Sequence, residues 1–394
     1  MSELLHPIDA YYERARELMA PASWAYLNGG AVDEISVRRN PDRYSEIALL
    51  PRVGVDVSEL QISQRLLGVD LPFPIMLAPA ALQLLFAEEG ELGTVRGAKA
   101  AGTAAVISME SSIPTRELAK ESGPFFQHIY VQRDRALTLE LVRMAEEAGA
   151  RGIAVTLDNP VPGIRYRQDA GMIGLPEGVR RANLESGGVP RLTGGYLDPS
   201  MTWKDLEWLV SHTELPVIGK GVLHPDDARL SIESGLQAVF VSNHGGRQLD
   251  RAPVPFHLLP HVVREVGKDA TVMVETGIMN GADIVESIAL GTKFTLIGRA
   301  YLYGLMAAAG RASTGPSPSS AARSNAPWPS SASQPSPNSS PATSRNSPGW
   351  SQSGTAPERR RSGEVAPRGP RGRIVRYRTK PSATTAECGR LEGG

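Results

Sequence analysis

Eight short apolar runs recur along the first 300 residues of this chain, and segments with the periodicity of amphipathic helices separate them. The runs are rich in Val, Ile, Leu, Phe and Ala, and their near-continuous hydrophobicity is typical of strands that are covered on both faces. They span residues 74–80, 104–109, 125–131, 152–158, 216–222, 238–244, 271–277 and 294–300.

Helical segments fit into the intervals between these runs, so strand and helix alternate. Repeated βα units at this spacing predict an α/β fold in which eight parallel strands close into a (β/α)8 TIM barrel. An open doubly wound sheet is the alternative, but no Gly-x-Gly-x-x-Gly sequence follows an early strand. The predicted helices span residues 90–101, 114–122, 135–148, 202–212, 225–234, 254–266 and 281–290.

The barrel is predicted to occupy residues 74–310. We expect residues 1–73 to form a helical N-terminal extension that closes the bottom of the barrel and contributes to the edge of the site. Residues 159–201 are rich in Gly, Pro and Arg, which predicts an extended loop over the active face.

Residues 311–394 differ sharply in composition from the rest of the chain. From 311 to 373 there is no Ile, Leu, Met, Phe or Tyr, so this segment lacks the apolar surface that would offset its chain entropy. We therefore predict a disordered tail, and only a short helical stretch, 301–309, follows the last strand, so the eighth barrel helix is missing. A shifted reading frame of a GC-rich gene and a genuine disordered extension both remain open as explanations.

The net charge of zero conceals an uneven distribution of charge. Residues 1–310 carry 29 basic and 38 acidic side chains, and this acidic balance argues against a nucleic-acid partner. The single cysteine, Cys388, permits neither a disulfide within the chain nor a cysteine metal site. No targeting segment or membrane span is recognisable, which predicts a cytoplasmic protein. No metal site is predicted.

A histidine and an arginine lie three residues apart on a glycine-rich turn directly after the sixth apolar run. In Val-Ser-Asn-His-Gly-Gly-Arg-Gln-Leu-Asp, residues 241–250, His244 can take and return a proton near neutral pH. Arg247 can hold a carboxylate through two parallel hydrogen bonds. The combination predicts a site for a small acid that loses a proton.

This ten-residue string resembles the active-site signature of the FMN-dependent 2-hydroxy acid oxidases and dehydrogenases, which include glycolate oxidase, lactate oxidase and mandelate dehydrogenase. The similarity can be followed from about residue 7 to residue 305. It implies FMN as cofactor, a small 2-hydroxy acid as substrate and a homo-oligomer, typically a tetramer. No cytochrome domain or membrane-binding segment is visible, which favours oxygen as the electron acceptor.

The resemblance also assigns roles to individual residues on the substrate side. His244 matches the catalytic base, and Asp158, in Thr-Leu-Asp-Asn-Pro, would favour its protonated form. Tyr130 matches a tyrosine that orients the substrate hydroxyl. The substrate carboxylate would be held by Arg247 together with Tyr26 and Arg165.

On the flavin side, Lys220 in the fifth run would stabilise the reduced ring, because a lysine inside an apolar run is costly without such a partner. His128 stands where the family has glutamine, and Gln127 lies one step earlier, so either could face the flavin. The residues that match cofactor-binding positions are Pro79, Ala80, Ala81, Ser108, Gln127, His128, Thr156, Lys220, Ser242, Gly277, Gly298 and Arg299.

Three positions depart from the family pattern. Met279 replaces an arginine on the phosphate side, Ala300 replaces the proline of Gly-Arg-Pro, and Glu110 stands where a tryptophan often covers the substrate. Glu110 favours a larger or polar substrate, such as an aromatic, mandelate-type acid. Met279 and the missing helix leave a second hypothesis open, an inactive relative that binds flavin weakly, and a third is another FMN barrel activity such as an isomerase.

Overall fold

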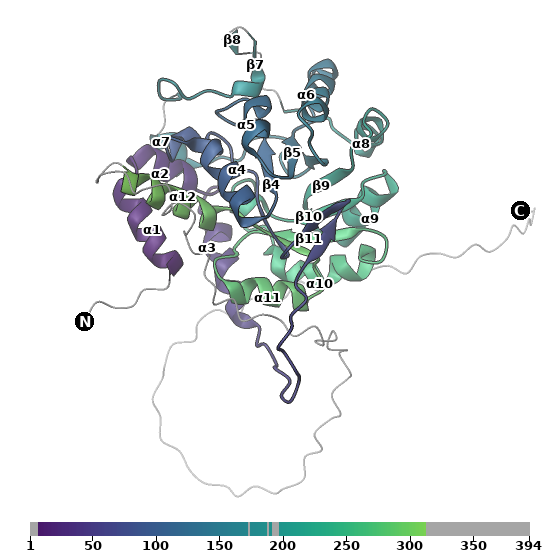
Figure 1. Cartoon of the computed structure of the whole chain (residues 1–394). Coiled ribbons are helices and arrows are strands. Elements are labelled where there is room, and N and C mark those ends of the chain that lie inside the picture. The colour runs from purple at the N-terminus through teal and green to yellow at the C-terminus, as the bar shows by residue number, and fades with distance from the viewer. Residues whose placement is uncertain (1–6, 172–173, 187–188, 191–196, 313–394) are drawn as a thin grey trace, which may run out of the picture. The chain divides into compact units, whose positions relative to one another are not determined.

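A closed barrel of eight parallel strands forms the centre of the computed structural model, which describes residues 7–171, 174–186, 189–190 and 197–312 (Figure 1). Neighbouring strands follow one another along the chain, and the pairing of Thr295 with Ile75 closes the ring. The TIM barrel is thereby confirmed and the open sheet is excluded. The strands are β3 (Ile75–Leu77), β4 (Ala105–Ser108), β5 (Phe125–Ile129), β6 (Ile153–Thr156), β9 (Val217–Val222), β10 (Ala238–Val241), β11 (Thr271–Glu275) and β12 (Phe294–Ile297).

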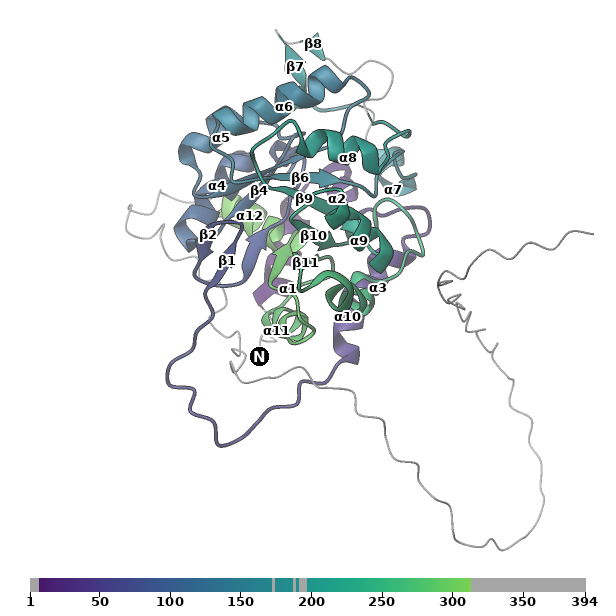
Figure 2. The same cartoon turned by 90° about the vertical axis from the view of Figure 1, so that its right-hand side faces the viewer.

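Helices surround the barrel at the seven places that the periodicity predicts (Figures 1 and 2). Several begin at a polar cap: the side chain of Asp134 accepts the amides of residues 136 and 137, and Asn280 with Asp283 forms a capping box. The seven helices are α4 (Gly90–Ala101), α5 (Thr115–Glu121), α6 (Arg135–Glu147), α8 (Trp203–Val210), α9 (Pro225–Glu233), α10 (Pro255–Val266) and α11 (Gly281–Ala289).

The inside of the barrel is a packed core. Phe126, Phe240 and Phe294 are fully buried there, together with Met76 and Met273. Polar groups therefore gather beyond the carboxyl ends of the strands, where the side chains are no longer enclosed by the ring.

The bottom of the barrel is closed by a hairpin, and the prediction that helices do so is wrong. Leu66 of β1 (Gln64–Leu66) and Val69 and Leu71 of β2 (Val69–Leu71) join the interior cluster. The N-terminal helices pack elsewhere, with α1 along α12 and α3 against the segment of His244. These elements are α1 (Pro7–Leu18), α2 (Pro21–Asn28), α3 (Ile35–Asp42) and the 3-10 turn η1 (Arg43–Glu46).

The long connection between β6 and α8 contains short elements that the sequence did not predict. They are α7 (Tyr166–Gly171), η3 (Ala182–Leu184), β7 (Glu185–Ser186) and β8 (Val189–Pro190). Elsewhere in the chain, the 3-10 turn η2 (Gln83–Leu85) follows β3 and the 3-10 turn η4 (His244–Gly246) follows β10. After β12 the chain forms α12 (Arg299–Ala312), which is longer than predicted. The predicted disordered tail and the absent eighth helix concern residues that lie outside the described part.

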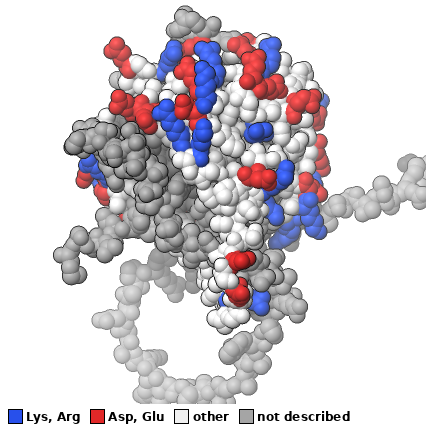
Figure 3. Space-filling model, viewed as in Figure 1, with Lys and Arg blue, Asp and Glu red and all other residues white. Residues whose placement is uncertain are grey.

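Acidic and basic side chains are interspersed on the face shown in Figure 3, and no extended patch of one sign covers the described residues there. Within the described ranges, no helix is both long and apolar enough to cross a membrane. The same residues contain no cluster of three or more His, Cys, Asp or Glu side chains arranged to hold a metal ion.

Candidate active site

Three consecutive residues after β10 adopt left-handed backbone conformations. His244, Gly245 and Gly246 have φ values of 58°, 65° and 75°. Glycine adopts this conformation freely, whereas histidine is strained in it. The strain at His244 is held by a hydrogen bond from its amide to the Ser242 hydroxyl, 2.9 Å, so the imidazole is fixed at the end of the strand.

The imidazole of His244 faces the carboxylate of Asp158 at the end of β6. Its Nδ1 lies 2.9 Å from Asp158 Oδ1, which orients the ring and leaves Nε2 as the basic nitrogen. Burial lowers the pKa of His244, and Asp158 opposes that shift. The pKa of Asp158 is lowered in turn, because the charges of His244 and Lys220 outweigh its burial. A neutral imidazole beside an ionised carboxylate can accept a proton.

Gly221 in β9 makes room for Asp158. Its φ is 100°, and a Cβ added there would lie 2.3 Å from Asp158 Cγ. The pairing of β9 with β10 shifts register between Phe240 and Val241, as expected for a β-bulge at this point.

Two guanidinium groups lie beside this pair. Arg247 donates to the carbonyl oxygens of Tyr26 and Gly29, at 2.6 and 2.9 Å, and its Cζ lies 5.2 Å from the centre of the Tyr26 ring. Arg165 donates from Nε to the carbonyl of Arg247, 3.0 Å. Burial, followed by the charge of Arg165, lowers the pKa of Arg247 to about 10, so it is still charged at neutral pH. Among the described residues neither side chain makes an ion pair, which suits an incoming anion.

The predicted substrate-binding tyrosines lie near this cluster. Tyr130 is 7% exposed, its ring packs edge-on against His128, and its hydroxyl interacts with the Asn159 side chain. Burial raises the pKa of Tyr130 strongly, and the charge of Glu110 raises it further. Burial likewise raises the pKa of Tyr26. Both phenols therefore keep their protons and can donate hydrogen bonds.

Lys220 is almost fully buried inside the barrel wall and pairs with Glu275 of β11. Its Nζ lies 2.5 Å from Glu275 Oε1, which also accepts the hydroxyl of Ser242 at 2.5 Å. Burial would lower the pKa of Lys220, but the charges of Glu275 and Asp158 raise it above the ordinary value. The ammonium group is thus charged and is held against the Glu275 carboxylate.

The side chains of Gln127 and His128 lie on opposite faces of β5. The Gln127 amide bonds to Thr115 of α5 and to the carbonyl of Ile107, so it lies on the outer face of the strand. His128 points the other way, with Nε2 2.7 Å from Thr156 Oγ1, while its buried Nδ1 has no hydrogen-bond partner in the described structure. His128 and Thr156 therefore join the predicted flavin side, and Gln127 does not.

The remaining predicted flavin residues lie at the ends of β3, β4, β11 and β12. Ser108 accepts the amide of Glu110, 3.1 Å, and Gly277 has a φ of 80°. Pro79, Ala80 and Ala81 form the turn after β3, whose neighbouring Ala78 carbonyl accepts the hydroxyl of Tyr301. The turn residues are small or compact and half-buried.

A phosphate group fits the residues at the start of α12. A Cβ added to Gly298 would meet nothing closer than 4.0 Å, and the first amides of a 14-residue helix follow it. Arg299 supplies a guanidinium that bonds to the carbonyls of Leu27 and Gly245, at 3.0 and 3.1 Å. Met279 brings no charge, and its amide is already bonded to Asp283. These residues could hold a flavin phosphate, and Arg299 would be the arginine of that group.

Three residues of the site were not predicted from the sequence. Gly221 and Asn159 acquire their importance only through contacts with Asp158 and Tyr130. The sequence also did not predict that Glu275 pairs with Lys220, 55 residues away. A buried lysine requires a counter-charge, and that requirement is the signal that could have identified Glu275.

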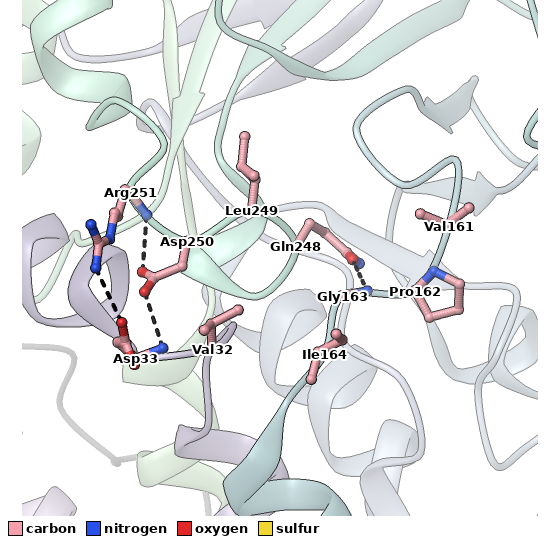
Figure 4. A pocket seen from close by; sticks show the side chains of 10 residues that line it. All are labelled: Val32, Asp33, Val161, Pro162, Gly163, Ile164, Gln248, Leu249, Asp250 and Arg251. Carbon is pink, nitrogen blue, oxygen red and sulfur yellow. Dashed lines mark hydrogen bonds and ion pairs between the residues drawn. The ribbon is translucent and has the colours of Figure 1, made fainter.

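A hollow of about 490 Å³ opens on the outer side of the same loops (Figure 4). In it, Gln248 bonds to the Gly163 amide, and Asp250 and Arg251 turn toward Asp33. His244 and Lys220 do not line this hollow. It is therefore separate from the group of residues that could carry chemistry.

The barrel and this arrangement of residues agree with the comparison to known sequences. A profile of the family described as FMN-dependent dehydrogenase matches residues 15–314. The chain belongs to the FMN-dependent dehydrogenase family, which confirms the resemblance drawn from the sequence, and with it FMN as the cofactor.

Individual relatives refine this class. The chain is 39% identical to the L-lactate oxidase of Nostoc sp. over 325 residues, which cover 77% of this chain and 89% of that one. It is 40% identical to a putative L-lactate dehydrogenase of Mycobacterium tuberculosis over 314 residues, with 73% and 76% covered. A crystal structure of mandelate oxidase with benzoyl-formic acid matches with a TM-score of 0.72 and 34% identity, over 76% of this chain and 87% of that one.

Proposed function

We propose that this protein oxidises an L-2-hydroxy acid to the 2-oxo acid and passes the electrons to oxygen, forming hydrogen peroxide. The observation that carries the proposal is the contact of His244 with Asp158 beside Arg247 and Arg165, two arginines without ion-pair partners among the described residues. A base and an anion site side by side suit an acid that loses a proton. Relatives named as lactate and glycolate oxidases support both the substrate class and oxygen.

The bound flavin would accept two electrons from the substrate, and that is the chemistry it supplies. Lys220 would face its ring, and Arg299 with the first amides of α12 would hold its phosphate. We further propose that His128, Thr156, Ser108 and the turn of Pro79, Ala80 and Ala81 line the ring, and that Ser242, Gly277 and Gly298 lie along the rest of the molecule.

The protein's own residues would bind the acid and take its proton. Arg247 and Arg165 hold the carboxylate, with the Tyr26 hydroxyl as a further donor. Tyr130 orients the substrate hydroxyl, and His244 Nε2 accepts a proton from the substrate. The neighbouring Asp158 carboxylate stabilises the imidazolium that forms, since opposite charges at hydrogen-bond distance favour the ionised state.

The decisive test is anaerobic reduction of the FMN-loaded protein with glycolate, lactate and mandelate. Loss of the oxidised flavin absorbance, followed by peroxide formation when air is admitted, is the expected result. Bleaching of the flavin without formation of peroxide would mean that the electron acceptor is not oxygen. The absence of bleaching by any 2-hydroxy acid would contradict the proposal and leave another FMN barrel activity, such as an isomerase.

A second candidate is an inactive relative that binds flavin weakly, and Met279 at the phosphate end favours it. Protein that is colourless after purification, and remains so after incubation with FMN, would support this alternative. We also propose that the chain is a cytoplasmic homo-oligomer, on the strength of the family resemblance, and sedimentation of the purified protein tests the assembly.

A further inference from the structure

An ion pair joins the loop after β4 to the residue that precedes η3 in the long β6–α8 connection. Arg181 Nε is 2.6 Å from Glu110 Oε1, and the side chains are 36% and 12% exposed. Glu110 directly follows Met109, whose sulfur accepts the amide of Tyr130 at 3.0 Å. Glu110 is therefore attached to the same part of the barrel mouth as Tyr130, one of the proposed substrate tyrosines.

The two charges lie within electrostatic reach of both tyrosine hydroxyls. After burial, the carboxylate of Glu110 is the next largest cause that raises the pKa of Tyr130. It also raises the pKa of Tyr26, which Arg181 lowers. Since such effects weaken with distance, Glu110 and Arg181 lie on the same side of the barrel as the two tyrosines, in keeping with the Met109–Tyr130 contact.

Neighbouring hydrogen bonds fix the position of Arg181. The Asn183 side chain donates to the Met109 carbonyl, 3.2 Å, and to the Ser111 hydroxyl, 2.9 Å, and accepts the Thr115 amide, 2.9 Å. The amide of residue 182 donates to the Ser111 carbonyl, 2.9 Å. The ion pair is thus held from both sides and presents a fixed polar surface.

Apolar side chains lie close by. Phe86 packs against Tyr26 with ring centres 5.9 Å apart, and Leu175 and Val179 join the same apolar cluster. A substrate side chain that extends away from Arg247 would therefore meet apolar walls and, at Glu110, a carboxylate.

We propose that Glu110 selects 2-hydroxy acids whose side chain ends in a neutral hydrogen-bond donor, such as a hydroxyl or an amide. This inference rests on the function proposed above. A carboxylate offers about four acceptor positions, so the bond from Arg181 does not exhaust its capacity. An apolar substrate side chain would remove water from the ion pair without replacing its hydrogen bonds. An anionic substrate side chain would be repelled by Glu110, and a cationic one would compete with Arg181 for the carboxylate.

Equilibrium binding tests the selection without turnover. Phenylacetate and its 4-hydroxy derivative lack the oxidisable hydroxyl, and their dissociation constants can be measured by the change that they cause in the spectrum of bound FMN. We expect the hydroxylated acid to bind the wild type at least about tenfold more tightly. In Glu110→Leu the two acids should bind about equally, and Glu110→Gln, which keeps the size and an acceptor oxygen, should retain part of the preference.

The second readout is anaerobic flavin reduction by mandelate and 4-hydroxymandelate. The ratio of their rates should fall in Glu110→Leu, while Glu117→Leu, an exposed position on the nearby α5, should leave it unchanged. FMN content and circular dichroism report whether each variant is folded, and Glu110→Gln replaces Glu110→Leu if the latter is not.

Three outcomes separate the two proposals. An unchanged ratio in a folded Glu110 variant overturns the selection by Glu110 and leaves the oxidase function intact. Tighter binding of the apolar acid to the wild type has the same consequence. If neither substrate bleaches the wild-type flavin although both acids bind, the proposed oxidation fails, and the binding ratio still decides whether Glu110 recognises the donor.

Discussion

At the scale of single residues, the site depends on two buried charge pairs, and each carries a different task. His244 with Asp158 can move a proton, whereas Lys220 with Glu275 holds a fixed positive charge in the barrel. Removal of one partner leaves the other charge buried and unpaired, which is costly. Single substitutions in these pairs should therefore have large and distinguishable effects.

Asp158→Asn should slow flavin reduction by about 10²-fold or more, because the imidazolium loses its carboxylate partner. The Asp158 charge raises the pKa of His244 against the effect of burial, so its removal lowers that pKa further. The acidic limb of the pH–rate profile should move to lower pH, since the base stays unprotonated there. Asp226→Asn, on the exposed start of α9, is the control. An acidic limb that moves to higher pH would refute the pairing.

Met279→Arg should strengthen FMN binding by about tenfold, because a second guanidinium would reach the phosphate end. Fluorescence titration of the apoprotein with FMN measures the dissociation constant, and Met279→Leu is the matched control without a charge. Equal affinity of the two variants would show that Arg299 and the start of α12 already satisfy the phosphate.

At the scale of elements, the irregularity in β9 leaves room for the carboxylate of Asp158, to which the proposed mechanism gives a role. A regular strand would place a side chain where Asp158 lies, and Gly221 avoids this. Gly221 therefore contributes to the site through the space that its missing side chain leaves for Asp158.

Gly221→Ala should reduce the rate of flavin reduction at least tenfold and destabilise the protein by about 1–3 kcal/mol, since its φ of 100° is strained for alanine. Thermal unfolding and anaerobic reduction measure the two effects. Gly97→Ala in α4 is the control, because its Cβ meets nothing within 4 Å and alanine favours a helix. A Gly221→Ala protein with wild-type rates would mean that Asp158 can move without loss.

At the scale of the whole molecule, the alternation of apolar runs and helical segments was sufficient to predict the barrel, because each strand is covered on both faces. The sequence does not predict the β1–β2 hairpin, since strands of three residues show too short a pattern of apolar and polar positions. The orientation of Gln127 depends on the phase of β5, in which Phe126 and His128 face inward. The pairing of Lys220 with Glu275 needs the closed ring, so sequence spacing alone could not predict it.

The stability of the molecule should depend on Glu286 of α11. Burial, followed by Asp283, raises its pKa to about 7. The folded state thus holds a proton that the unfolded state releases near pH 4.5, and stability falls as the pH rises from about 4.5 to 7. Glu286→Gln should be more stable than the wild type at pH 8 by about 1–2 kcal/mol and nearly equal to it at pH 4.5. Urea unfolding at both values measures this, with exposed Glu233→Gln as control, and a difference independent of pH would contradict it.

The contact between the N-terminal helices and the turn of His244 has a consequence for the order in which the protein folds. Asn40 and Asn243 exchange amide hydrogen bonds, and Asp250 accepts the amides of Asp33 and Ser36. These partners are more than 200 positions apart. During synthesis the N-terminal helices are made first, but they can form these contacts only after most of the barrel has been synthesised. The segment of His244 therefore acquires its final hydrogen bonds late in folding.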